Sequence, residues 1–318
     1  MFIKRLFVFV VRLDSQHTGI LGIIKGMQRN WRRGKLSILS ALVLGMAFSA
    51  AAKPSPSVCP VTAGRQYELS FRARVVAGPT LEEHPEYADL VSICVNRPTV
   101  TGIRFAAVGW TFLSAQRKKV ARPYEGGQPI VLFSREWRQF SERIWIPENV
   151  ASIKVSPSPG AKGNKVEVKD VTVRELPADG TLFSTPSFDD ACWPSGWQLV
   201  GGALYLTDAK GRGIVSTESG HANSSVFPVV PGSRLAVSVR GAVTPRADRP
   251  KFNCWVSFAA DYEATQKAKG FRKSMVPVTI TGGRTSAVHE YAVPEGMTWA
   301  RVAAWNGDLK GLEVKVVK

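Results

Sequence analysis

The residues of this sequence that are best suited to chemistry do not form a catalytic pattern. Three histidines follow residue 52 at distant positions, and no serine-hydrolase, zinc-protease or phosphate-loop motif accompanies them. Four carboxylates surround the first histidine, but glycoside hydrolysis needs a second carboxylate placed opposite the first. We therefore interpret this segment as a charged, solvated loop and expect a protein that is not an enzyme. The residues concerned are His84, His221 and His289, and the carboxylates Glu82, Glu83, Glu86 and Asp89.

Tryptophan side chains offer a better basis for ligand binding, because sugar rings stack on flat apolar faces. Trp145 alternates with Ile144 and Ile146, so in a regular strand it faces away from them, beside Arg143. It is a candidate for ligand stacking, or else it packs on a neighbouring domain or second sheet. Glu142 shares the inward face with Ile144. It is either a core group with a hydrogen-bond partner or part of a cleft. The tryptophans expected mostly in the core are Trp110, Trp137, Trp193, Trp197, Trp255, Trp299 and Trp305.

Basic side chains gather in two loops that occupy matching places in the two halves of the chain. The formal net charge of the whole sequence is +17. The loops, together with two arginines on outward strand positions, could attract anionic polysaccharides such as sulfated or uronic-acid glycans. The alternative is a solubilising surface without a specific partner, and no nucleic-acid-binding motif is present. The candidate residues are Arg117, Lys118 and Lys119 in the first loop, Lys267 and Lys269 in the second, and Arg72 and Arg240 on the strands.

The first 52 residues have the pattern of a leader that ends in a secretory signal peptide. A basic segment at 29–35 precedes an apolar run at 36–48, and small residues lead to a cleavage site after Ala52. We expect translation to start at Met27 and the mature protein to be secreted or to lie in the cell envelope, in the periplasm or outside the cell. A membrane association is expected only if the leader stays uncleaved.

Four cysteines fall two in each half of the sequence. None has the C-x-x-C spacing typical of zinc sites or thioredoxin-like proteins. In an oxidising compartment we expect one disulfide in each half, Cys59–Cys94 and Cys192–Cys254, out of the three connectivities that four cysteines allow. Four buried free thiols remain the alternative interpretation.

The two halves share a repeated pattern, since residues 59–75 and 227–243 align without a gap. Each segment has a glycine turn followed by apolar and polar residues in strict alternation, which predicts a half-buried antiparallel strand. Further short strands and turns predict an all-β protein of two tandem antiparallel β-sandwich domains. The expected boundaries are a leader at 1–52, a first domain at 53–176, a linker at 177–180 and a second domain at 181–318. The first domain is abridged at its N-terminus.

Several short motifs resemble the galactose-binding-like jelly-roll family, and within it the carbohydrate-binding modules attached to glycoside hydrolases. Residues 187–190 with 196–197, the turn at 230–232, the strand from Trp137 to Pro147 and residues 169–171 carry the resemblance. It implies a jelly-roll fold, a carbohydrate partner, no catalytic cofactor and a structural calcium ion near Asp189 or Asp190. The second half departs from the pattern, with Arg284 in place of the long-strand tryptophan.

Together these observations predict an exported, non-catalytic tandem carbohydrate-binding protein whose ligands include anionic glycans. The alternative is a structural or adhesive protein of the cell envelope whose sandwiches bind other proteins.

Overall fold

The computed structural model of the chain describes none of the leader and most of the residues that follow it. All described residues belong to one compact unit, Pro56–Lys318. The predicted signal peptide therefore lies outside the described part. No helix within that part is long and apolar enough to cross a membrane. The described residues are 57–80, 83, 106–123, 130–131, 134–158, 163–185, 196–200, 204–208, 211–243, 251–274, 276–281 and 284–317.

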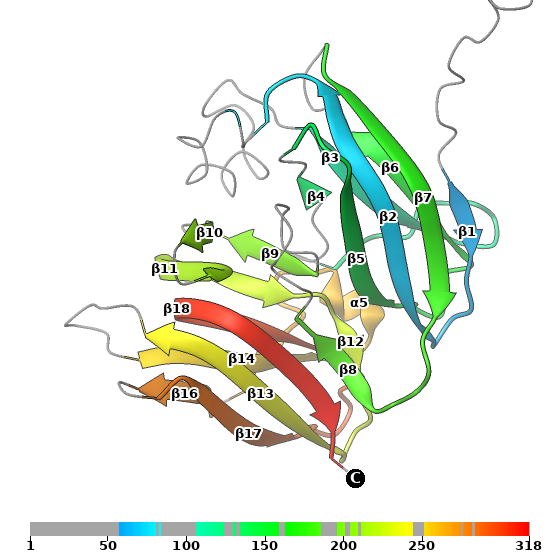
Figure 1. Ribbon diagram of the computed structural model, residues 1–318. Helices are drawn as coiled ribbons and strands as arrows, with labels where there is room; N and C mark the ends of the chain where they lie inside the picture. The colour runs from blue at the N-terminus through cyan, green and yellow to red at the C-terminus, as the bar shows by residue number, and fades with distance from the viewer. Residues whose placement is uncertain are drawn as a thin grey trace, which may run out of the picture. The chain divides into compact units, whose positions relative to one another are not determined.

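The first half folds into two antiparallel sheets (Figure 1). One sheet has the order β1-β6-β3-β4 and the other has the order β5-β2-β7. Apolar side chains at alternate positions of β2 and β5 face the space between the sheets, and Phe71 stacks on Phe140 with ring centroids 5.1 Å apart. The strands are β1 (Val58–Pro60), β2 (Gln66–Ala77), β3 (Ala107–Leu113), β4 (Ile130–Val131), β5 (Arg138–Trp145), β6 (Ser152–Ser158) and β7 (Lys165–Glu175).

The second half contains the same two layers with additional strands. Its layers have the orders β12-β18-β14-β16 and β17-β13-β18, so β18 takes the places of both β6 and β7. Its elements are β8 (Thr181–Ser184), β9 (Trp197–Val200), β10 (Leu204–Asp208), β11 (Gly211–Ser224), β12 (Phe227–Pro228), β13 (Arg234–Val243), β14 (Lys251–Ala259), the short helix α5 (Tyr262–Thr265), β15 (Arg272–Lys273), β16 (Val278–Thr281), β17 (Ser286–Ala292) and β18 (Trp299–Val316).

The matching sheet orders confirm the predicted fold class of two tandem antiparallel β-sandwiches. Every strand pair among the described residues joins two strands on the same side of residues 177–180. Buried side chains of both halves nevertheless join in one hydrophobic cluster. The exact domain boundaries remain predictions.

β18 passes from one layer of the second sandwich to the other at Asn306. Residues before it pair with β14, and residues after it pair with β13. Asn306 has a φ of +64°, a left-handed conformation that asparagine tolerates better than most residues. Its side-chain Nδ2 donates a hydrogen bond of 2.7 Å to the carbonyl oxygen of Lys251. This bend lets one strand complete both layers.

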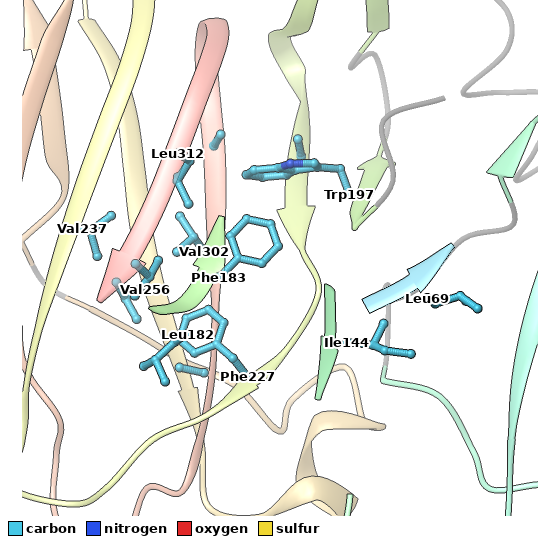
Figure 2. Packing of buried hydrophobic residues seen from close by; sticks show 14 of the residues in the cluster. Leu69, Ile144, Leu182, Phe183, Trp197, Phe227, Val237, Val256, Val302 and Leu312 are labelled. Carbon is cyan, nitrogen blue, oxygen red and sulfur yellow. The ribbon is translucent and has the colours of Figure 1, made fainter. Parts of the chain in front are cut away.

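The core of the second sandwich is built around aromatic side chains (Figure 2). Phe183 lies edge-on to Trp197 with ring centroids 5.5 Å apart, and it also packs on Phe227. Phe227 is fully buried, and burial of a side chain of this size stabilises a fold by about 1.5–3 kcal/mol. These residues come from β8, β9 and β12, so β8 and β9, which have no counterpart in the first half, contribute directly to the core.

The outer edge of the three-stranded sheet differs between the halves. In the second half β8 pairs with the end of β18, whereas β7 pairs only with β2 among the described residues. An uncovered edge of this kind is consistent with the predicted abridgement of the first domain at its N-terminus. β7 carries charged residues along its length, and Asp170 interrupts its ladder with a φ of +54°. Charges and irregular pairing both discourage strand addition at a sheet edge.

Candidate functional site

Two tryptophans lie side by side on the outward surface of the second sandwich. In β14 the side chains of Phe252, Cys254 and Val256 are buried, so Trp255 between them faces outward. In β18 the same alternation turns Trp305 outward. The two rings meet at an angle of 68° with centroids 5.4 Å apart, and both are half-buried. The expectation of core positions for these two residues is therefore corrected.

Polar side chains surround this pair in rows that cross the sheet. His221 pairs with Trp305, and its ring lies 6.3 Å from the indole. Asn223 pairs with Gln198 on the next strand. Lys273 places its ammonium nitrogen 3.5 Å from the centroid of the Trp255 ring, a favourable cation–π contact. We call this set the tryptophan face: Gln198, His221, Asn223, Trp255, Lys273, Arg301 and Trp305.

Three polar members of the tryptophan face, Gln198, Asn223 and Arg301, are buried. Asn223 is 1% exposed and Arg301 is 8% exposed, with its guanidinium 3.9 Å from the centroid of Phe271. The side-chain oxygen of Gln198 is buried without a hydrogen-bond partner among the described residues. Planar amides, a cation and flat indole rings on one surface can bind a hydroxyl-rich ring by stacking and hydrogen bonding. Among the described residues there is no group of three or more His, Cys, Asp or Glu side chains that could hold a metal ion.

The corresponding surface of the first sandwich lacks this arrangement. Trp110 pairs with Val155 in the first sandwich, and Val256 pairs with Val302 at the corresponding place in the second. Trp110 therefore points inward like Val256, and Gly109 takes the place of Trp255. Trp110 is 5% exposed, and its Nε1 donates a hydrogen bond of 3.0 Å to Glu142. A shift of one residue in a strand moves a side chain to the other face. Only the second sandwich therefore has a paired-tryptophan surface on this layer among the described residues.

Trp145, the predicted stacking candidate, contacts the second half of the chain. Its Nε1 donates a hydrogen bond of 2.7 Å to the carbonyl oxygen of Leu182, and its ring packs against the hydrophobic cluster. Of the two interpretations left open by the sequence, the geometry matches packing on the neighbouring sandwich. Gln66 also donates to the Leu182 carbonyl, at 3.3 Å.

Glu142 is a buried carboxylate with partners in both halves. It accepts hydrogen bonds from Trp110 at 3.0 Å and from the Ser225 hydroxyl at 3.2 Å. Arg122 lies nearby, with its guanidinium 5.1 Å from the Trp110 ring centroid. Burial lowers the pKa of Arg122, and the charge of Glu142 opposes that shift. Glu142 is thus a core group whose hydrogen bonds are satisfied, one of the two alternatives from the sequence.

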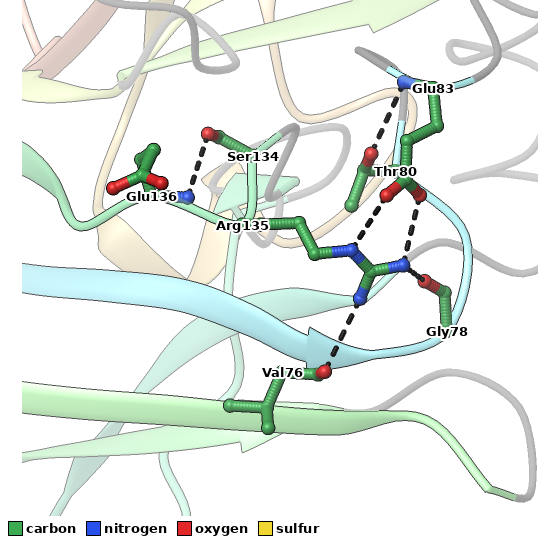
Figure 3. Close-up of polar contacts among 7 residues, drawn as sticks. All are labelled: Val76, Gly78, Thr80, Glu83, Ser134, Arg135 and Glu136. Carbon is green, nitrogen blue, oxygen red and sulfur yellow. Dashed lines mark hydrogen bonds and ion pairs between the residues drawn. The ribbon is translucent and has the colours of Figure 1, made fainter.

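The carboxylate segment considered for hydrolysis is described only in part. Glu83 is held by Arg135, which donates to its two carboxylate oxygens at 2.6 and 2.9 Å (Figure 3). Arg135 also donates to the carbonyl oxygens of Val76 and Gly78. The hydrogen bonds from Arg135 lower the pKa of Glu83. This carboxylate therefore fastens a loop to the end of β2; Glu82, Glu86, Asp89 and His84 lie outside the described residues.

The two predicted strand arginines lie on separate sheets. Arg72 lies 6.0 Å from the centroid of the Trp137 ring, which also contacts Arg74 at 4.8 Å and Lys169 at 4.2 Å. Trp137 is half-buried beneath these cations, not in the core as expected. Arg240 lies against Gly311, at the matching place on β13.

The two predicted basic loops adjoin one another, since Gln266 beside the second donates a hydrogen bond to the carbonyl oxygen of Ala121 near the first. A tight turn, closed by a hydrogen bond from the Ser114 amide to the Lys118 carbonyl, presents Arg117, Lys118 and Lys119 to solvent. In the second loop Lys267 forms an ion pair of 2.9 Å with Glu263, and Lys269 is exposed. The loops approach one another across a cavity between the sandwiches, which is described below. Their role in binding remains a prediction.

Several predicted residues cannot be placed. Asp189 and Asp190, the candidates for a calcium site, lie outside the described residues, as do Cys94 and Cys192. Cys59 is half-buried and Cys254 is fully buried, which raises the pKa of both thiols. Both disulfide pairings remain predictions.

The tryptophan face was not predicted from the sequence, although the signal for it was present. Residues 252–256 alternate between buried and outward positions in the same way as the strand around Trp145. The alternation that predicted an outward position for Trp145 predicts an outward position for Trp255 as well. The pairing of His221 with Trp305 could not be read from local patterns, because these residues are far apart in the sequence.

Comparison with known proteins gives structural likenesses only. No family model matches the chain, and no curated protein matches its sequence. The tandem CBM22-1–CBM22-2 domains of Xyn10C from Paenibacillus barcinonensis are 10% identical, with 82% of each chain covered and a TM-score of 0.33. The C-terminal family 22 carbohydrate-binding module of Xyn10B from Clostridium thermocellum is 13% identical, covering 44% of this chain and 94% of its own, with a TM-score of 0.28.

A plant receptor is similar over a comparable length. The ectodomain of ANX2 from Arabidopsis thaliana is 13% identical, with 83% of this chain and 82% of its own covered and a TM-score of 0.22. At these scores the likenesses carry no argument about ligand or activity.

Proposed function

We propose that this protein is a non-catalytic carbohydrate-binding protein and that it binds its ligand on the tryptophan face of the second sandwich. The single observation that supports this most strongly is the outward pair Trp255 and Trp305, with planar polar side chains in the adjoining rows. Flat apolar rings bordered by hydrogen-bonding groups suit the alternating C–H and hydroxyl surfaces of a sugar.

Anionic glycans are included in the proposal because cations border the rings. Lys273 lies over Trp255, and Arg301 occupies the outward position that precedes Ala303 on β18. A carboxylate or sulfate on the sugar would gain an attraction that weakens as salt is added. The proposal also includes export, which rests on the leader in the sequence, and a calcium ion near Asp189 or Asp190.

Binding of neutral and acidic polysaccharides to the mature chain tests the proposal. Affinity electrophoresis on gels that contain each polysaccharide, at several salt concentrations, would identify a ligand. Trp255→Ala and Trp305→Ala should each weaken binding at least about tenfold, which corresponds to about 1.4 kcal/mol. Trp137→Ala is the matched control, because it removes a half-buried tryptophan from the first sandwich. Circular dichroism would check that each variant is folded.

The proposal fails if the chain binds none of the polysaccharides, or if both variants bind as tightly as the unaltered protein. Absence of glycan binding together with a stoichiometric protein complex from the cell envelope would favour a structural or adhesive role instead.

A further inference from the structure

A cavity of about 640 Å³ lies between the two sandwiches and is separate from the tryptophan face. The first sandwich contributes the turn with Lys118 and Lys119, and also Glu148. The second contributes the start of α5 and Trp299, the first residue of β18. Its volume is within the range of about 300–1,000 Å³ for small-molecule sites. Trp299 precedes Trp305 by six residues in β18, roughly 20 Å along a strand, so a short ligand cannot contact both.

Hydrogen bonds between the sandwiches fix the walls of this cavity. The Tyr262 hydroxyl donates to the carbonyl oxygen of Ala121 at 3.2 Å, and Gln266 donates to the same oxygen at 3.4 Å. Asp261 caps α5 by accepting a hydrogen bond of 2.6 Å from the Ala264 amide. The cavity is therefore formed before any ligand binds, which lowers the entropic cost of binding.

The lining combines donors, acceptors and an aromatic surface. Lys118, Lys119 and Glu148 are exposed and form no ion pair with any described residue. The half-buried Trp299 has its ring 5.1 Å from that of Tyr262, at an angle of 62°. A ligand of one charge sign would face like charges in this cavity. Hydroxyl groups can accept hydrogen bonds from the ammonium groups and donate hydrogen bonds to the carboxylate. An uncharged ligand that carries hydroxyl groups therefore suits both kinds of side chain.

We propose that the cavity is a second binding site, which takes a short uncharged segment of a glycan. The inference rests on the proposed function for the class of ligand and adds a site to which both sandwiches contribute. It also changes the expectation for the basic loop, because Lys118 and Lys119 act here as hydrogen-bond donors to hydroxyl groups and do not select anions.

The indole N–H signals of the isotope-labelled full chain can separate the two sites by NMR. The probes are cellotriose, xylotriose and maltotriose, with trigalacturonate as the charged comparison. Trp255→Ala/Trp305→Ala should leave a titration in which the Trp299 signal shifts with a neutral trisaccharide. Adding Lys118→Gln/Lys119→Gln should weaken that titration at least tenfold, whereas Lys165→Gln, at an exposed position of β7 outside the lining, should leave it unchanged.

The outcomes separate the two proposals. If neutral trisaccharides shift only Trp255 and Trp305 and never Trp299, the cavity site is overturned and the tryptophan face stands. If only Trp299 shifts, the tryptophan face is overturned and the cavity stands. Tighter binding of trigalacturonate than of every neutral probe at Trp299, or a Trp299 titration unaffected by Lys118→Gln/Lys119→Gln, would also overturn the cavity proposal.

Discussion

Strand β3 of the first sandwich and strand β14 of the second occupy the same place in their sheets, yet their tryptophans point to opposite sides. Trp110 is buried and bonded to Glu142, while Trp255 faces outward beside Trp305. The backbone pairing of β3 with β6 is as regular as that of β14 with β18. The two copies therefore keep the same strand order although their outward residues at this place differ.

The two copies also differ in how their layers are joined. The first uses separate strands, with β6 ending at Ser158 and β7 beginning at Lys165. The second uses the single strand β18, bent at Asn306. A single bent strand holds the two layers in fixed register, whereas two strands can be adjusted separately. We expect substitutions near the bend to have larger effects than equivalent changes in the first copy.

Exchanging one residue between the aligned strands β2 and β13 should give the largest difference in the free energy of unfolding. Gly241 on β13 corresponds to Ala73 on β2, and a Cβ at Gly241 would lie 2.5 Å from the carbonyl oxygen of Asp308. Gly241→Ala should destabilise the protein by about 1–3 kcal/mol through overpacking. The reciprocal Ala73→Gly should cost less, up to about 1 kcal/mol. Urea unfolding would compare the two, and a harmless Gly241→Ala would mean that β18 can move away from β13.

Asn306 allows the bend itself to be tested. Asn306→Ala should cost about 1–2 kcal/mol, because alanine is strained in the left-handed region and the bond to Lys251 is lost. Asn306→Gly loses the side-chain hydrogen bond but tolerates the left-handed conformation, so it should cost about half as much. Thermal unfolding of both variants provides the measurement. Equal costs for alanine and glycine would show that the backbone conformation contributes nothing.

The smallest expected effect concerns pH and the outer face of the first sandwich. Arg174 lies 2.7 Å from Glu68, and its hydrogen bond lowers the pKa of that carboxyl, with a further contribution from Ser141. A carboxyl with a depressed pKa in the folded state stabilises the protein above its unfolded pKa, and this stability is lost as the pH falls through the folded value. Glu68→Gln should therefore lower stability at pH 7 by at most about 1 kcal/mol.

The measurement is the unfolding midpoint in urea between pH 2 and pH 7. The difference between the unaltered protein and Glu68→Gln should shrink as the pH falls. A constant difference across that range would contradict the assignment of this pH dependence to Glu68.

The fold was predictable because strand alternation is local and occurs twice. The sequence at 59–75 and 227–243 indicated matching strands, and these are β2 and β13 with the segments before them. The single-strand join at Asn306 was not predictable, since nothing in the local pattern of β18 distinguishes a bent strand from a strand, a turn and another strand. The tryptophan face depends on registers such as His221 with Trp305, which are set by long-range pairing.

The bent strand has a consequence for the order in which the chain can fold. β18 contributes to both layers of the second sandwich, and the Thr185 hydroxyl bonds to the Leu312 carbonyl across 127 residues of sequence. Pairing over such distances is slow, because the intervening loop must close first. During synthesis the first sandwich has all its described strands once Glu175 has left the ribosome, but β8 must wait for β18. The first sandwich can then serve as a folded surface on which the second sandwich assembles. Trp145 is already in position to donate its hydrogen bond to the carbonyl oxygen of Leu182.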